Sequence, residues 1–115
     1  MKKILFVLSV IILSCSAVYA QKIFKESYSS QADIKVFVES YESQADLNVY
    51  LEQYESRAGK DGLWFMEDYE SRADIKVFFV DYESQADLKI FYVDYESQAG
   101  WKDPSKSYIL KFKDR

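Results

Sequence analysis

The stretch IKVFVESYESQAD, residues 34–46, decides the fold, because close copies of it follow along the chain. LNVYLEQYESRAG (47–59), IKVFFVDYESQAD (75–87) and LKIFYVDYESQAG (88–100) keep its pattern. A tyrosine four residues before an alanine recurs at spacings of 13, 13, 15, 13 and 13, at Tyr28, Tyr41, Tyr54, Tyr69, Tyr82 and Tyr95. Units this short cannot bury a face alone, so we expect them to stack into one array.

The first half of each unit predicts a β-strand. Ile34, Val36 and Val38 alternate with Lys35 and Phe37, a period of two that makes one face aliphatic. The opposite face mixes lysine with an aromatic ring, so we expect it to be half covered.

Each unit also requires a reversal of the chain. A continuous helix would rotate every thirteen-residue copy by roughly 220° from the last, and a continuous strand of odd period would exchange its faces. The segment Tyr-Glu-Ser-Gln-Ala is the expected corner. Because the chain has only three glycines, a wide corner in ordinary backbone conformations is favoured over a tight hairpin. Five corner serines are placed to hydrogen-bond local backbone, namely Ser43, Ser56, Ser71, Ser84 and Ser97.

The units form two triplets. The residues after the six alanines read Asp, Asp, Gly twice over, and each triplet ends in an irregular loop, at residues 60–62 and 101–104. These features predict an all-β domain of two similar halves. We expect seven strands, which begin near Ile23, Ile34, Leu47, Leu63, Ile75, Leu88 and Tyr108.

The first twenty residues are typical of a bacterial secretory signal peptide. Lys2 and Lys3 precede an apolar run, residues 4–13, that is shorter than the roughly 20 residues a membrane-spanning helix needs. We predict cleavage between Ala20 and Gln21, a domain over residues 21–115, and a secreted or periplasmic location. A competing interpretation is a lipoprotein signal in which Cys15 is lipidated and anchors the chain to the membrane, although Leu13 fits that motif poorly.

Composition excludes several classes of site and partner. Cys15 is the only cysteine and there is no histidine, so the mature chain lacks disulfides, thiol nucleophiles and the usual transition-metal ligands. Removing the signal lysines leaves 13 basic against 19 acidic residues, which disfavours nucleic acid and anionic membranes as partners. We expect a monomer that is not an enzyme, has no cofactor and does not insert into the membrane after processing.

The regularly spaced acids suggest two interpretations. Calcium-binding β-rolls use glycine-rich repeats, which this chain lacks. Aspartate instead stands two residues before lysine in Asp33–Lys35, Asp74–Lys76 and Asp87–Lys89, and solvated cross-strand charge ladders are the favoured interpretation.

Aromatic residues supply candidates for a binding surface. One ring recurs at the same position of successive units, at Phe37, Tyr50, Phe65, Phe78 and Phe91. Such a stripe is more often core than a platform for sugars, and core is favoured here. Trp64 and Trp101 lie beside the two irregular loops and are the candidate binding surface, because loops on a rigid scaffold often carry function.

At this point the pattern resembles a known family. Segments reading Ala-Asp-Ile/Leu-Lys/Asn-Val/Ile-Phe/Tyr, separated by Tyr-Glu-Ser corners and interrupted by Asp-Gly-Leu-Trp-Phe, are similar to the bacterial septoil-knot domain over residues 22–113. The resemblance implies a small all-β chain wound into a seven-crossing torus knot, formerly a domain of unknown function, and it implies no catalytic residue or ligand.

The sequence therefore predicts an exported protein with a structural or interaction role, whose partner is a protein or polysaccharide of the cell envelope. A binding module that uses an aromatic surface is the alternative. An unrecognised hydrolase is a remote one, since it would need a concave pocket lined by perturbed carboxylates.

The predicted processing can be tested by intact mass spectrometry of the exported protein. We expect the mass of residues 21–115, with or without cyclisation of Gln21. A mature chain that begins at a lipid-modified Cys15 would contradict this expectation.

Overall fold

The computed structural model describes residues 21–55 and 60–110. The signal peptide, its cleavage after Ala20 and the lipidation of Cys15 therefore lie outside the described residues, apart from Gln21 itself. The described strands are β1 (Gln21–Lys25), β2 (Ile34–Val38), β3 (Leu47–Glu52), β4 (Leu63–Met66), β5 (Ile75–Phe79), β6 (Leu88–Tyr92) and β7 (Gly100–Trp101). Short 3-10 turns alternate with them, η2 (Ser29–Gln31), η3 (Glu42–Gln44), η5 (Glu70–Arg72), η6 (Glu83–Gln85) and η7 (Glu96–Gln98), followed by a longer one, η8 (Pro104–Leu110).

The first six predicted strands are confirmed, and the seventh is wrong. Tyr108 lies in η8, whereas the last strand is the two-residue β7, which pairs antiparallel with the start of β3. Proline at the first position of η8 favours a helical start. Ile109 and Leu110 then pack against the core from this turn, so their apolar character does not require a strand.

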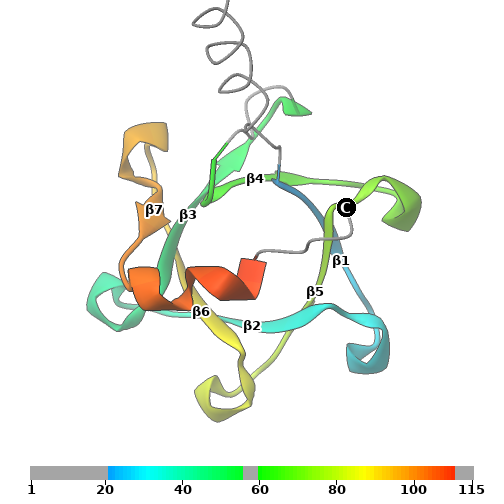
Figure 1. Cartoon of the computed structure of the whole chain (residues 1–115), viewed down its shortest axis with the longest axis horizontal. Helices are drawn as coiled ribbons and strands as arrows, with labels where there is room; N and C mark the ends of the chain where they lie inside the picture. Colours follow the sequence, from blue (N-terminus) through cyan, green and yellow to red (C-terminus); the bar gives the residue numbers. More distant parts are fainter. Residues whose placement is uncertain (1–20, 56–59, 111–115) are drawn as a thin grey trace, which may run out of the picture.

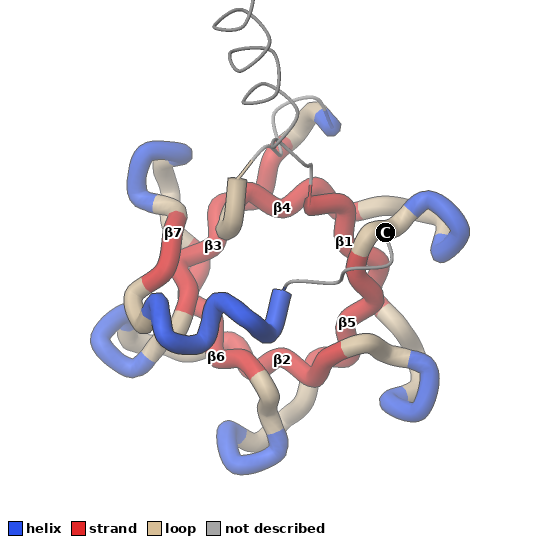
Figure 2. Tube along the Cα trace, viewed as in Figure 1, coloured by secondary structure: helices blue, strands red, loops and turns tan. Residues whose placement is uncertain are grey.

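Six parallel strands close into a barrel in the order β1-β5-β2-β6-β3-β4 (Figure 1). Within each triplet, successive strands lie two places apart around the barrel. The first triplet, β1 to β3, therefore leaves gaps that the second triplet, β4 to β6, fills, and the described corners project outward (Figure 2). Each barrel strand is thus hydrogen-bonded on both sides to strands of the other triplet.

The aliphatic face of each strand points into the barrel. The register advances by two residues from one strand to the next, since Ile75 pairs with Ile23 of β1 but Val77 pairs with Ile34 of β2. One equivalent residue from each strand forms a central layer that is 0 % exposed, made of Ile23, Val36, Val49, Trp64, Val77 and Ile90. The expected aliphatic face is therefore the core.

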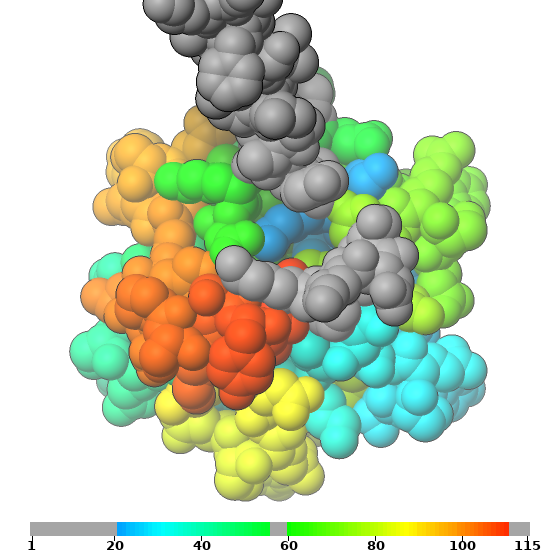
Figure 3. Space-filling model, in the orientation of Figure 1, coloured from blue at the N-terminus to red at the C-terminus, as the bar shows by residue number. Residues whose placement is uncertain are grey.

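The two ends of the barrel differ. At the end where the strands begin, η8 lies across the opening and Leu110 is only 7 % exposed (Figure 3). At the end where they finish, Val38, Leu51 and Tyr92 are 38, 43 and 37 % exposed. The core is therefore closed at one end by a helical segment and at the other by its own partly exposed side chains.

A buried polar network accommodates the largest core side chain. The Trp64 indole Nε1 donates a hydrogen bond to Gln21 Oε1 at 3.0 Å, and the Gly62 backbone N–H donates to the same oxygen at 3.1 Å. Gln21 Nε2 in turn donates to Asp61 Oδ1 at 2.7 Å. Gln21 of β1 thus satisfies the buried indole, and Asp61 and Gly62 of the irregular loop in turn bind Gln21.

The corners are wide, as expected. In η3 the Gln44 N–H donates to Tyr41 O and the Ala45 N–H donates to Glu42 O, both at 3.1 Å, and within the described residues no non-glycine residue has positive φ. The serine prediction is wrong for the corners that the structure describes. The side chains of Ser43, Ser71, Ser84 and Ser97 are exposed and donate no hydrogen bond, because backbone carbonyls already satisfy the turn.

Gly62 provides a direct test of the close packing at the irregular loop. Its φ is +97°, and an added Cβ would lie 2.7 Å from Asn48 O and 2.9 Å from Gly100 N. We expect Gly62→Ala to lower the free energy of unfolding by roughly 2–4 kcal/mol, measured by urea denaturation.

Gly100→Ala is the matched control, because Gly100 also has positive φ, at +143°, but an added Cβ would meet no atom within 4 Å. Its cost should be about 1 kcal/mol, from backbone strain alone. Equal urea midpoints for the two variants would contradict the packing assigned to Gly62.

Candidate binding surface

Apart from Tyr108 of η8, the most exposed aromatic residues that the structure describes lie on the corners of the barrel. Each corner tyrosine directly precedes the polar turn, and its backbone is extended, as at Tyr41 with φ −127° and ψ 129°. Their side chains are 61–68 % exposed, at Tyr28, Tyr41, Tyr54, Tyr69, Tyr82 and Tyr95. Because the corners project outward around the whole barrel (Figure 2), the tyrosines form a surrounding set of six similar sites rather than one patch.

Polar side chains accompany each ring. In η3, η6 and η7 the residues after the tyrosine are Glu-Ser-Gln, all exposed. The corner at η5 differs, since Arg72 replaces glutamine and its guanidinium lies 5.3 Å from the centre of the Tyr69 ring. Each described corner thus offers an aromatic face beside hydrogen-bonding groups, the combination found at many recognition surfaces.

The surface predicted from the tryptophans is wrong for Trp64. That residue is 0 % exposed and lies in the central layer of the core. Trp101 is half-buried, and its Nε1 donates a hydrogen bond to Asp61 Oδ2 at 2.7 Å. The two irregular loops do meet, through this hydrogen bond from Trp101 to Asp61, and the contact links the two loops to each other.

The aromatic stripe lies outside the barrel rather than in the core. Phe37, Phe65, Phe78 and Phe91 alternate with the inward residues of their strands and are half-buried, as is Tyr50. They are absent from the cluster of buried core residues. The stripe is a partly covered outer layer, so the half-covered face that the sequence predicts is confirmed, whereas the assignment of the stripe to the core is wrong.

The aspartates do not form the predicted charge ladders. Asp33 donates its backbone N–H to Lys76 O at 2.7 Å, and its carboxylate accepts the Lys76 N–H at 2.8 Å. Asp46 holds Lys89 in the same way, at 2.7 and 3.0 Å. The same reciprocal contact joins Asp74 to Lys22 and Asp87 to Lys35. Each aspartate therefore binds the backbone of a strand from the other triplet, where the strand edge would otherwise lack an acceptor.

The lysine side chains pair with corner glutamates instead. Lys76 Nζ lies 3.4 Å from Glu70 Oε2, and Lys89 Nζ lies 3.8 Å from Glu83 Oε2. These pairs are partly exposed, so their contribution to stability is small. They link Glu70 and Glu83 to the strand that follows each of these corners.

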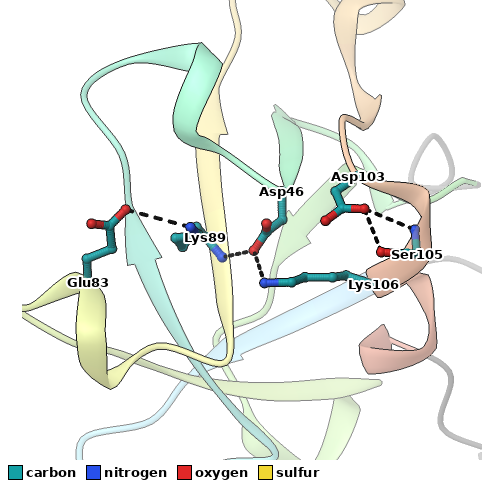
Figure 4. Close-up of polar contacts among 6 residues, drawn as sticks. All are labelled: Asp46, Glu83, Lys89, Asp103, Ser105 and Lys106. Carbon is teal, nitrogen blue, oxygen red and sulfur yellow. Dashed lines mark hydrogen bonds and ion pairs between the residues drawn. The ribbon is translucent and has the colours of Figure 1, made fainter.

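A polar cleft of about 530 Å³ lies between η3, η6 and the segment before η8, lined by Ser43, Gln44, Ala45, Asp46, Glu83, Lys89, Lys102 and Asp103. Figure 4 shows that contacts join Glu83, Lys89, Asp46 and Lys106 in a row, whereas Asp103 bonds to Ser105. Asp46 Oδ2 accepts the Lys89 N–H at 3.0 Å and lies 3.4 Å from Lys106 Nζ. Hydrogen bonds from Ser105, the shorter at 2.6 Å, lower the pKa of Asp103. The cleft therefore offers hydrogen-bonding groups rather than uncompensated charge.

Comparison with known proteins assigns the architecture. The model of the 7(1) septoil knot domain matches residues 20–102, which include all six barrel strands and β7. The chain belongs to the septoil knot family. The all-β knotted fold is thereby confirmed for this septoil-knot chain. No curated protein and no solved structure matched it.

Two further observations apply to the septoil knot as described, residues 21–55 and 60–110. No helix in these ranges is long and apolar enough to cross a membrane. In the same ranges, no three acidic, cysteine or histidine side chains converge in a way that could hold a metal ion.

Sequence reasoning missed the corner tyrosines as candidates, because their regularity identified them as structural. The signal was nonetheless present. In every corner the tyrosine is followed by three polar residues, most often Glu-Ser-Gln, and polar neighbours on the C-terminal side are typical of an exposed ring.

The aspartate contacts between triplets predict an order of stabilities. Asp46 is 5 % exposed, so Asp46→Ala leaves the Lys89 N–H without its carboxylate acceptor in a buried site and should cost roughly 1–3 kcal/mol. Asp87→Ala removes the same contact at an exposed site and should cost about 1 kcal/mol or less.

Asp94→Ala serves as the control, because Asp94 is exposed and lies outside these contacts; it should change stability by less than about 0.5 kcal/mol. Urea denaturation measures all three variants. If Asp46→Ala were no less stable than Asp94→Ala, the proposed contribution of these contacts would be wrong.

Proposed function

We propose that this septoil-knot protein is a non-enzymatic, exported interaction module whose corner tyrosines bind a repetitive polysaccharide of the cell envelope. The observation that supports this proposal is the set of six tyrosines, 61–68 % exposed, on corners that project from a closed barrel. A large aromatic side chain this exposed at every corner contributes little to the core.

The chemistry of the corner suits a sugar. A tyrosine ring presents an apolar face that can pack on the C–H groups of a pyranose, and its hydroxyl can exchange hydrogen bonds with sugar hydroxyls. The exposed serine and glutamine of the same corner add further donors and acceptors. A polysaccharide repeats its unit as the protein repeats its corner, so several weak contacts can act together.

The absence of a distinct catalytic group among the described residues supports a non-enzymatic role. The cleft contains Glu83, which contacts the buried Glu39, the kind of perturbed carboxyl that a hydrolase would use. The same arrangement recurs at Glu26 and Glu70, which do not line the cleft. A pair that occurs twice, once away from the cleft, is better explained as part of the repeat.

Co-sedimentation with insoluble envelope polysaccharide tests the proposal. We expect the purified protein to sediment with the polymer. A single replacement, Tyr82→Ser, should weaken binding by about 2–5-fold, whereas combining Tyr41→Ser, Tyr82→Ser and Tyr95→Ser should weaken it by roughly 10–100-fold, because the effects of linked weak sites multiply.

Tyr108→Ser is the matched control, since Tyr108 is 69 % exposed but lies on η8 rather than on a corner; it should bind like the wild type. Failure of the wild type to sediment, or equal binding by the triple variant, would refute the proposal. If the wild type retained a protein from envelope extract and the triple variant did not, the tyrosines would be assigned to a protein partner instead.

A further inference from the structure

Glutamates are buried where the strands of the first triplet end. Glu26 and Glu39 directly follow β1 and β2 and are 5 and 6 % exposed. After β5 and β6 of the second triplet the same position holds Val80 and Val93. The position therefore accepts an apolar side chain, and a carboxyl there needs a specific partner.

The partner of each buried glutamate is a second carboxyl, supplied by a corner of the other triplet. Glu26 is in hydrogen-bond contact with Glu70 of η5, and Glu39 with Glu83 of η6. Two ionised carboxylates have no proton with which to make such a bond. The Oε2 atoms of Glu26 and Glu39 also meet no hydrogen-bond donor.

The charges around each pair are similar. Lys76 and Asp33 face the Glu26–Glu70 pair, and Lys76 Nζ lies 3.4 Å from Glu70 Oε2. One lysine therefore compensates one carboxylate of the pair, while the nearby aspartate opposes ionisation of the second.

The Glu39–Glu83 pair has the corresponding neighbours. Lys89 and Asp46 face it, and Lys89 Nζ lies 3.8 Å from Glu83 Oε2. The lysine already supplies the positive charge beside each pair, so a proton is the natural occupant of the contact and a divalent cation would be repelled.

We propose that one shared proton in each pair acts as a latch that holds corners η5 and η6 against the barrel, and that its loss as the pH rises releases these two corners. Tyr69 and Tyr82 immediately precede Glu70 and Glu83, the corner glutamates of the two pairs. The latch therefore controls the position of two of the six exposed tyrosines. This inference does not depend on the polysaccharide proposed above.

The direction of the pH effect follows from the titration of the buried carboxyls. Burial first, and then the neighbouring corner glutamate, raise the pKa of both Glu26 and Glu39 above the ordinary 4.5. A folded-state pKa above the unfolded value means that the folded protein binds more protons between the two values. The stabilisation is therefore complete below about pH 4.5 and decreases as the pH rises through the folded-state pKa.

Backbone amide chemical shifts followed by NMR across pH 4–9 test the latch one corner at a time. In η6 the Ala86 N–H donates to Glu83 O, and in η5 the Ala73 N–H donates to Glu70 O. In the wild type we expect both signals to titrate with a midpoint above 4.5. Glu39→Gln supplies a permanent N–H donor to Glu83, so it should abolish the step at Ala86 and leave the step at Ala73.

Glu26→Gln should do the reverse, which keeps the test valid if one variant is unstable. Glu42→Gln is the matched control, because Glu42 Oε2 accepts from Asn48 Nδ2 at 2.8 Å instead of sharing a proton with a buried acid; both steps should persist. Flat wild-type signals over this range, or loss of both steps in either single variant, would overturn the proposal. Removal of the steps by millimolar calcium would assign the contact to a metal ion and overturn it as well.

Discussion

The structure depends on one constraint, that each barrel strand forms its barrel hydrogen bonds only with strands of the other triplet. β2, for example, lies between β5 and β6, and β5 lies between β1 and β2. Neither triplet can therefore form a sheet of its own. The ring closes where β3 meets β4, at the one step in which the tyrosine spacing is 15 rather than 13 residues. The irregular spacing therefore coincides with the step from β3 to β4, where the chain passes from the first triplet to the second and successive strands are direct neighbours.

The same interleaving creates the polar contacts between the halves. Because a strand of one triplet runs beside the other, Asp33 reaches the backbone of Lys76, and Glu39 meets the corner that carries Glu83. The corners must pass outside the neighbouring strand before the chain returns to the barrel, which leaves their tyrosines in solvent. The closed barrel, the carboxyl pairs and the exposed tyrosines thus all follow from the interleaving of the two triplets.

Local periodicity was sufficient to predict the six barrel strands, their aliphatic face and the corners, because these depend on residues close together in the sequence. The burial of Trp64 was not predictable in this way. Its hydrogen-bond partner is Gln21, which is brought there only by the pairing of β1 with β4. The prediction of charge ladders failed because the aspartate carboxylates bind backbone N–H groups of the neighbouring strand, whereas the lysine side chains pair with corner glutamates. The prediction of a last strand near Tyr108 was wrong because it rested on the apolar residues Ile109 and Leu110. These residues pack against the core from a 3-10 turn that begins at Pro104.

Native-state hydrogen exchange measures the central claim most directly, by giving an opening free energy for each strand amide. If the two triplets are mutually dependent, the amides of β1, β2 and β3 should exchange with the same free energy as those of β5 and β6, and both should equal the free energy of global unfolding. Exchange from one triplet at a distinctly lower free energy, with the other still protected, would show that a triplet can open alone and would contradict the account.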